Sequence, residues 1–152
     1  MTIEELGRLV CAGTVKVRGH DLPIVALSDK LLAKVAEAFT QPRAPMVKDP
    51  TKGSMAAPIA DVQDDKYRKA VRAWNVETRA AQAVLGLDLA FVFEGQTIKM
   101  SDCRGLEAAA YNVRLQAATD QLREVLSGDE IDGVVNEMDA LTRGATARAE
   151  KN

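Results

Sequence analysis

The chain has 152 residues, of which 47% are hydrophobic and 28% are charged. This length suffices for one domain with its own hydrophobic core, and this balance excludes an intrinsically disordered chain. The formal charge of −2 gives no overall attraction to nucleic acid, because nucleic-acid-binding domains are typically strongly basic. Aromatic residues make up only 4% and alanine is abundant, which favours closely packed helices over a sandwich of sheets.

The first 27 residues predict a helix followed by a β-hairpin. Thr2 and Glu5 have the spacing of a capping box, and the helix that they begin is expected to end at Gly13. Residues 14–18 alternate between apolar and polar, which predicts a short strand, and residues 22–27 return as its partner after a turn at 19–21.

A second helix is expected at 29–39, with Ser28 as its N-cap. The segment 40–63 that follows is rich in proline and predicts no regular structure. A segment of this length without secondary structure is uncommon inside a domain, so we expect a working loop or a linker. It contains four of the five prolines of the chain: Pro42, Pro45, Pro50 and Pro58.

A long helix is predicted to begin at Asp64 and Asp65, because carboxylates stabilise a helix N-terminus, and to end at Gly86. Apolar side chains recur along it at steps of four and three, as in a coiled-coil seam. The seam consists of Tyr67, Val71, Trp74, Thr78, Ala81 and Leu85.

Residues 89–93 and 96–100 predict a second hairpin, joined by a turn at Glu94-Gly95. The alternative is that the preceding helix continues through residues 84–93. Ser101 and Asp102 offer N-caps for the helix that follows.

Two helices are expected in the last third of the chain, at 106–126 and 131–141, with a break at 127–130 where Gly128 ends the first and Ser127 or Asp129 caps the second. The apolar face of the first is assigned to Ala109, Ala110, Val113, Ala117, Leu122 and Val125.

The fold class is therefore mainly α. We expect a single helical domain at 1–141 with one or two short β-hairpins and the Pro-rich loop at 40–63. From Thr142 the residues become small, polar and charged, which predicts a flexible tail at 142–152.

No residue pattern in the chain predicts catalysis. His20 is the only histidine and lies in a turn, and Cys11 lies on an apolar helix face with no partner that would activate it. The paired carboxylates all fall at predicted helix starts, where capping explains them. Two cysteines, Cys11 and Cys103, are too few and too far apart for a disulfide framework or a metal site. We therefore expect no enzyme activity, no cofactor and no metal.

No segment has the pattern of a signal peptide, and no apolar run approaches the length of a membrane span. The sequence thus predicts a cytoplasmic protein that does not contact membranes.

A cluster of basic residues lies on the long helix at 66–85. With Tyr67 and Trp74 as stacking platforms, this helix would suit a small DNA-binding regulator. An ordinary solvated helix face is the favoured interpretation, because both aromatic residues fall on the apolar seam. The cluster consists of Lys66, Arg68, Lys69, Arg72 and Arg79.

The segment from Ser28 to Leu87 resembles the tail assembly chaperones of long-tailed, siphovirus-type bacteriophages. Those proteins have a helical N-terminal part, a Pro-rich loop and an Asp-x-x-Tyr entry to an Arg- and Ala-rich helix. The family commonly has proline just before the tyrosine, where this chain has Lys66. The residues that carry the resemblance are Pro42-x-x-Pro45-Met46-Val47-x-Asp49-Pro50-x-Lys52-Gly53 and Asp64-Asp65-x-Tyr67-x-x-Ala70-Val71-x-x-Trp74.

The resemblance implies a non-enzymatic protein of the host cytoplasm that binds the helical tape-measure protein and keeps it soluble. It also implies help in recruiting tail-tube protein, self-association as a further option, and absence from the finished virion. Many members of the family are made in two lengths by ribosomal frameshifting. A structural tail or connector subunit is the alternative, and for that class we expect a β-rich fold.

A tape-measure helix needs an apolar groove with an adaptable rim. We expect the helices at 29–39 and 64–86 to line such a groove and methionines of the Pro-rich loop to gate it. The alternative is that these side chains form the core of the domain. The candidate partner-binding residues are Leu32, Val35, Phe39, Met46, Met55, Tyr67, Val71 and Trp74.

Overall fold

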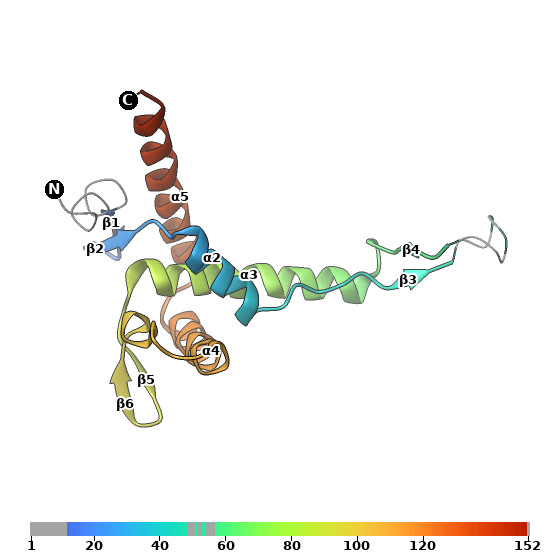
Figure 1. The fold of residues 1–152 in the computed structure, drawn as a ribbon, viewed down its shortest axis with the longest axis horizontal. Helices are drawn as coiled ribbons and strands as arrows, with labels where there is room; N and C mark the ends of the chain where they lie inside the picture. The colour runs from blue at the N-terminus through green and yellow to red at the C-terminus, as the bar shows by residue number, and fades with distance from the viewer. Residues whose placement is uncertain (1–11, 49–50, 52, 54–56, 152) are drawn as a thin grey trace.

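The computed structural model describes residues 12–48, 51, 53 and 57–151, with side chains described as far as residue 144, and it is mainly helical. Its described strands form three antiparallel pairs, which agrees with the predicted fold class (Figure 1). The helix expected from Thr2 lies outside the described residues, except that Gly13 is part of a strand. No helix of the described part is long and apolar enough to cross a membrane.

The central element is the long helix α3 (Asp65–Leu87). Three alanines in its second half are fully buried, and their small side chains let the neighbouring helices approach closely. The packing of Ala-rich helices that the composition predicts is therefore present. The helices that contact α3 are α2 (Asp29–Ala38), α4 (Ala108–Val125) and α5 (Gly128–Lys151).

The predicted N-caps of α2 and α3 are both present. The Ser28 hydroxyl accepts a hydrogen bond from the backbone of Leu31 at 3.3 Å, and the Asp64 carboxylate accepts one from the backbone of Tyr67 at 2.9 Å. The predicted end of α3 at Gly86 is wrong, because the helix continues to Leu87. Gly86 lies inside the helix, where a Cβ atom would overlap the sulfur of Met138.

The first hairpin pairs β1 (Ala12–Val17) with β2 (His20–Val25) and packs on α5. Its turn is at Arg18 and Gly19, one residue earlier than expected. Both have positive φ angles, of 50° and 80°. His20 begins β2 and is exposed.

The guanidinium of Arg18 ties this turn to the junction between α4 and α5. It donates to both carboxylate oxygens of Glu130 at 2.8 Å and to the carbonyl of Val125 at 2.8 Å. Glu130 also accepts from the backbone of Ser127, whose hydroxyl accepts from the backbone of Glu130 in return. The hydrogen bond from Arg18, followed by that from the Ser127 backbone, lowers the pKa of Glu130 to about 2.

The second predicted hairpin is confirmed, and the alternative of a continuing helix is excluded. It pairs β5 (Phe91–Phe93) with β6 (Gln96–Ile98) through Glu94 and Gly95. The side-chain amide of Gln121 in α4 accepts from the Val92 backbone at 2.9 Å and donates to its carbonyl at 2.6 Å. Gln121 therefore satisfies the open edge of β5 and attaches the hairpin to α4. Ser101 and Asp102 lie in a short 3-10 helix, η2 (Met100–Cys103), and do not cap α4.

The apolar face predicted for α4 is partly wrong. Ala109, Val113 and Val125 are exposed. Val113 lies on the side of α4 opposite its buried residues, whereas Ala109 and Val125 lie at the two ends of the helix. The residues of α4 that are buried are Tyr111, Leu115, Ala118, Thr119 and Leu122.

Helix α5 begins earlier and ends later than expected. Ser127 caps it as predicted, but Gly128 starts it and does not end the preceding helix, which ends at Val125. The helix continues to Lys151, so the loss of regular structure expected from Thr142 is absent, while the flexibility of 142–152 stays a prediction. Its buried stripe contains Ile131, Val134, Val135 and Met138.

Leu115→Ala and Val113→Ala test the assignment of the buried face of α4. Leu115 is fully buried, so its truncation should lower the free energy of unfolding by about 2–5 kcal/mol. Val113 is 52% exposed, so its truncation should change that free energy by about 0.5 kcal/mol or less. Urea denaturation followed by circular dichroism measures both, and equal losses would contradict the assignment.

Glu130→Gln tests the link between the first hairpin and α5. Since the folded pKa of Glu130 lies below the ordinary 4.5, its ionisation stabilises the fold above about pH 4.5, and this contribution is lost as the pH falls toward 2. Urea midpoints should therefore be lower for the variant at pH 7 and should converge with those of the wild type near pH 2. A gap that does not change with pH would show that the carboxylate charge is not involved.

A candidate partner-binding arm

The first half of α3 extends away from the helical body together with the segment that precedes it (Figure 1). We call residues 41–76 the arm, of which 41–48, 51, 53 and 57–76 are described. In the arm no described residue is fully buried, whereas from Thr78 most residues of α3 are. The first half of α3 therefore belongs to the arm, and the second half belongs to the body.

Beyond the start of α3, the Pro-rich segment contains a short strand pair that the sequence did not predict. Strand β3 (Met46–Val47) pairs with β4 (Ile59–Ala60), and the backbone of Asp61 donates to the carbonyl of Pro45 at 2.8 Å. A strand of two residues is too short to show a recognisable alternation of apolar and polar residues in the sequence.

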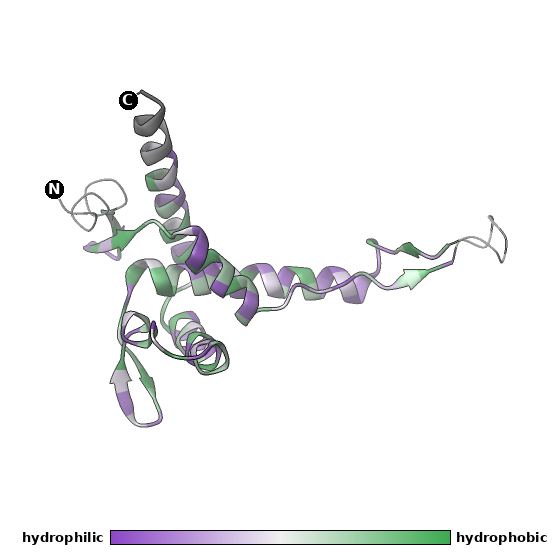
Figure 2. Ribbon diagram, viewed as in Figure 1, coloured by the Kyte–Doolittle hydropathy of each residue, from purple (hydrophilic) through white to green (hydrophobic). Residues whose placement is uncertain are grey.

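Figure 2 shows hydrophobic residues in the strands β3 and β4 of the arm. Several apolar side chains of the arm are exposed to solvent. Met46 is 62% exposed, Ile59 is 50% exposed and Val62 is 55% exposed. They lie away from the core and do not stabilise it by burial. An exposed apolar group of this kind on a projecting element is typical of an interaction surface.

Tyr67 lines two hollows on the arm. One hollow, of about 240 Å³, is lined by residues of the Pro-rich segment and the start of α3: Pro42, Arg43, Pro45, Asp64, Lys66, Tyr67 and Ala70. The other, of about 260 Å³, is lined by Val62, Tyr67, Arg68, Val71 and Arg72. Each hollow thus combines apolar walls with two basic side chains.

The predicted site residues divide between the arm and the core. Met46, Tyr67 and Val71 lie on the arm, and Met55 lies outside the described residues. Val35 is 3% exposed and belongs to the core, where no partner reaches its side chain. Leu32 is partly exposed on α2, beside a small hollow at the α5 side of the body.

The expected groove between α2 and α3 is filled by the protein's own packing. The indole Nε1 of Trp74 donates to the carbonyl of Phe39 at 2.8 Å, and Phe39 packs against the core. Trp74 therefore joins the end of α2 to α3 at the base of the arm.

The predicted basic cluster is also divided between the body and the arm. Arg79 donates to Asp132 at 2.7 Å and to Asn136, so it joins α3 to α5. The side chains of Lys66, Arg68, Lys69 and Arg72 are exposed and form no salt bridge within the described part of the chain.

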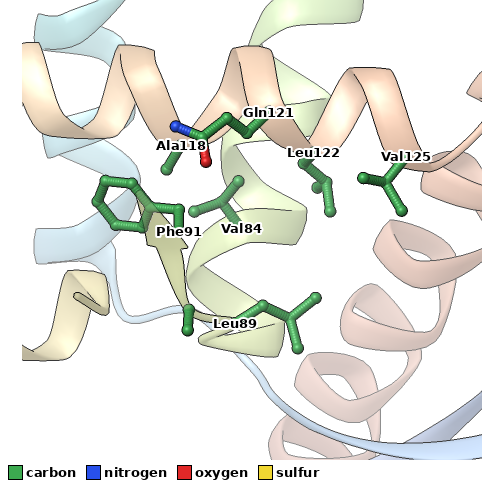
Figure 3. Close-up of a pocket in the computed structure, with 8 residues that line it drawn as sticks. Val84, Leu89, Phe91, Ala118, Gln121, Leu122 and Val125 are labelled. Carbon is green, nitrogen blue, oxygen red and sulfur yellow. The ribbon is translucent and has the colours of Figure 1, made fainter. Parts of the chain in front are cut away.

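A further hollow, of about 330 Å³, lies on the body between α4, β5 and the end of α3 (Figure 3). Its polar side chain, Gln121, is already bonded to Val92. The sequence did not predict this hollow, because Leu89 was assigned to a strand and Val125 to the apolar face of a helix. Its lining consists of Val84, Leu89, Ala90, Phe91, Ala118, Gln121, Leu122 and Val125.

Ionisable side chains are distributed over the described residues. Among them, no group of three His, Cys, Asp or Glu side chains is arranged to hold a metal ion. Cys103 is buried, and desolvation raises the pKa of its thiol. No family model, curated protein or solved structure matches the chain.

Trp74→Phe tests the junction between the arm and α2. The variant keeps an aromatic ring but loses the donor to Phe39, so the free energy of unfolding should fall by about 0.5–1.5 kcal/mol. Because Trp74 is the only tryptophan, the wild-type protein should show one indole N–H signal by NMR, protected from solvent exchange. An indole signal that exchanges as fast as free tryptophan would contradict this contact.

Proposed function

We propose that this protein is a non-enzymatic assembly chaperone of the bacteriophage-tail type. It binds the tape-measure protein through the arm, keeps that protein soluble and assists assembly of the tail tube. Its place of action is the host cytoplasm, and it leaves before the virion is complete.

The observation that carries the proposal is the exposure of Met46, Ile59 and Val62 on a projecting element. Leaving such side chains in water forgoes the free energy of their burial, about 1.5–3 kcal/mol for each one that is fully covered. A partner that covers them gains this free energy. A long apolar helix, insoluble by itself, is a suitable partner.

The resemblance supports the same surface. The matching segment, Ser28 to Leu87, corresponds to α2, the arm and the rest of α3. Within it, Asp64 caps α3 and Tyr67 lines both hollows. The residues that carry the resemblance therefore have a structural part in the proposed site.

The two alternatives differ in their support. A tail or connector subunit would be expected to be β-rich, whereas the described structure is mainly helical. A DNA-binding regulator is supported by Arg68, Lys69 and Arg72, which form no salt bridge with the described residues. Glu substitutions at these three positions, in a gel shift with duplex DNA, test it: unchanged migration excludes that alternative.

Co-expression with the tape-measure protein of the same phage tests the proposed function. The tape measure should be soluble only when this chain is present, and many copies should co-purify with each tape measure. Ile59→Ser should weaken the association about tenfold, because one aliphatic contact is lost. Val113→Ser, which removes an exposed apolar side chain from α4, is the matched control and should have no effect. An insoluble tape measure with nothing co-purifying would overturn the proposal.

A further inference from the structure

The second hollow of the arm, which is lined by Val62, Tyr67, Arg68, Val71 and Arg72, combines two kinds of surface. Val62 and Val71 form apolar walls with the tyrosine ring, and Arg68 and Arg72 stand at its edge. A closed cavity of about 150 Å³ accommodates benzene. The hollow of about 260 Å³ is therefore large enough for a leucine or methionine side chain.

The two arginines lack a partner within the described part of the chain. The salt bridges there are formed by Arg18 and Arg79, both on the body. Arg68 and Arg72 are exposed, and neither guanidinium has a hydrogen-bond acceptor among the described residues. Their charges are thus available to a bound molecule.

The charge of the chain is divided between the arm and the body. Residues 41–76 contain seven Lys or Arg and four Asp, which gives a formal charge of +3. Since the whole chain carries −2, the remaining residues carry −5. The arm therefore attracts an anionic partner that the body repels.

The spacing of the arginines indicates the shape of that partner. Arg68 and Arg72 are four residues apart on α3, so their Cβ atoms are about 6 Å apart on one face of the helix. Carboxylates at positions i and i+4 of a second helix lying along α3 have the same spacing. An apolar residue of that helix, adjacent to the carboxylates, then enters the hollow.

We infer that this face of the arm binds an amphipathic helix whose apolar stripe is flanked by Asp or Glu. The inference rests on the proposed function only for the identity of the partner, the tape-measure protein. Nucleic acid would also pair with the arginines, but Val62 and Val71 offer nothing to phosphate, and the charge of the body opposes it. The apolar walls favour a protein helix.

Three synthetic helical peptides of about 20 residues, a length at which helices become stable, test the chemistry. They share one leucine stripe and differ only in the flanking residues, which are Glu, Lys or Gln. Fluorescence anisotropy should show the Glu peptide binding at least about tenfold more tightly than the Lys peptide, with this difference decreasing as salt is added. Equal affinities would overturn the inference.

Charge reversals on α3 test the location. Arg68→Glu and Arg72→Glu should each weaken binding of the Glu peptide about five- to tenfold. Lys69→Glu makes the same change in charge on the same helix but lies outside the hollow, so it should have little effect. Equal losses in all three variants would show that only net charge matters and would overturn the assigned site.

A substitution at Val62 tests the apolar wall of the hollow. Val62→Ser should weaken binding of all three peptides, whereas Val113→Ser on α4 should not. Duplex DNA is the competing probe. If it displaces the Glu peptide and binds with the same dependence on Arg68 and Arg72, the site is one for nucleic acid and the inference fails.

These outcomes separate the inference from the proposed function. Tape-measure protein that co-purifies equally well with the Arg68→Glu and Arg72→Glu variants leaves the function intact and removes the inference. Binding of the Glu peptide without any association with the tape measure leaves the inference intact and removes the proposed function.

Discussion

The close approach of three helices to the second half of α3 is the constraint on which the rest of the structure depends. Ala80, Ala81 and Ala83 are fully buried there, and Gly86 has no room for a Cβ atom beside Met138. Small side chains bring the helix surfaces together, so dispersion contacts are dense and voids are few. Larger residues at these positions would separate the helices and open the core.

The same helix has the opposite character in its first half. Before Thr78 the residues of α3 are exposed or partly buried, whereas most residues from Thr78 onward are buried. Trp74 lies at the boundary and is bonded to Phe39 at the end of α2. A helix that is rigidly held at one end can present the other end to a partner without a large cost in conformational entropy.

The hairpins β1–β2 and β5–β6 lie around this helix packing and are attached to it by side-chain hydrogen bonds. Arg18 joins the first hairpin to the start of α5, and Gln121 joins the second to α4. In each case one side chain satisfies backbone or carboxylate groups that would otherwise face solvent at the edge of a small sheet. Among the described residues, the side-chain hydrogen bond that attaches the arm to the end of α2 is the one from Trp74 to Phe39.

Local signals in the sequence were sufficient for the caps at Ser28 and Asp64 and for the hairpin around Gly95, because each depends on residues within one or two turns of the chain. Residues that depend on distant neighbours were less predictable. Val113 has a helical spacing that fits an apolar face, and yet it is exposed because α3 contacts the other side of α4. Val35 was assigned to a binding groove and lies in the core.

The sequence by itself thus determined the kinds of most elements and the basic, apolar character of residues 41–76, since these follow from periodicity, capping and composition. Only the tertiary structure decided which apolar residues are buried and which basic residues remain unpaired. Arg79 and Arg72 lie on the same helix, but Arg79 faces Asp132 of α5, whereas Arg72 extends beyond the reach of the body. Burial and ion pairing are properties of contacts between distant segments, and no local pattern of residues specifies them.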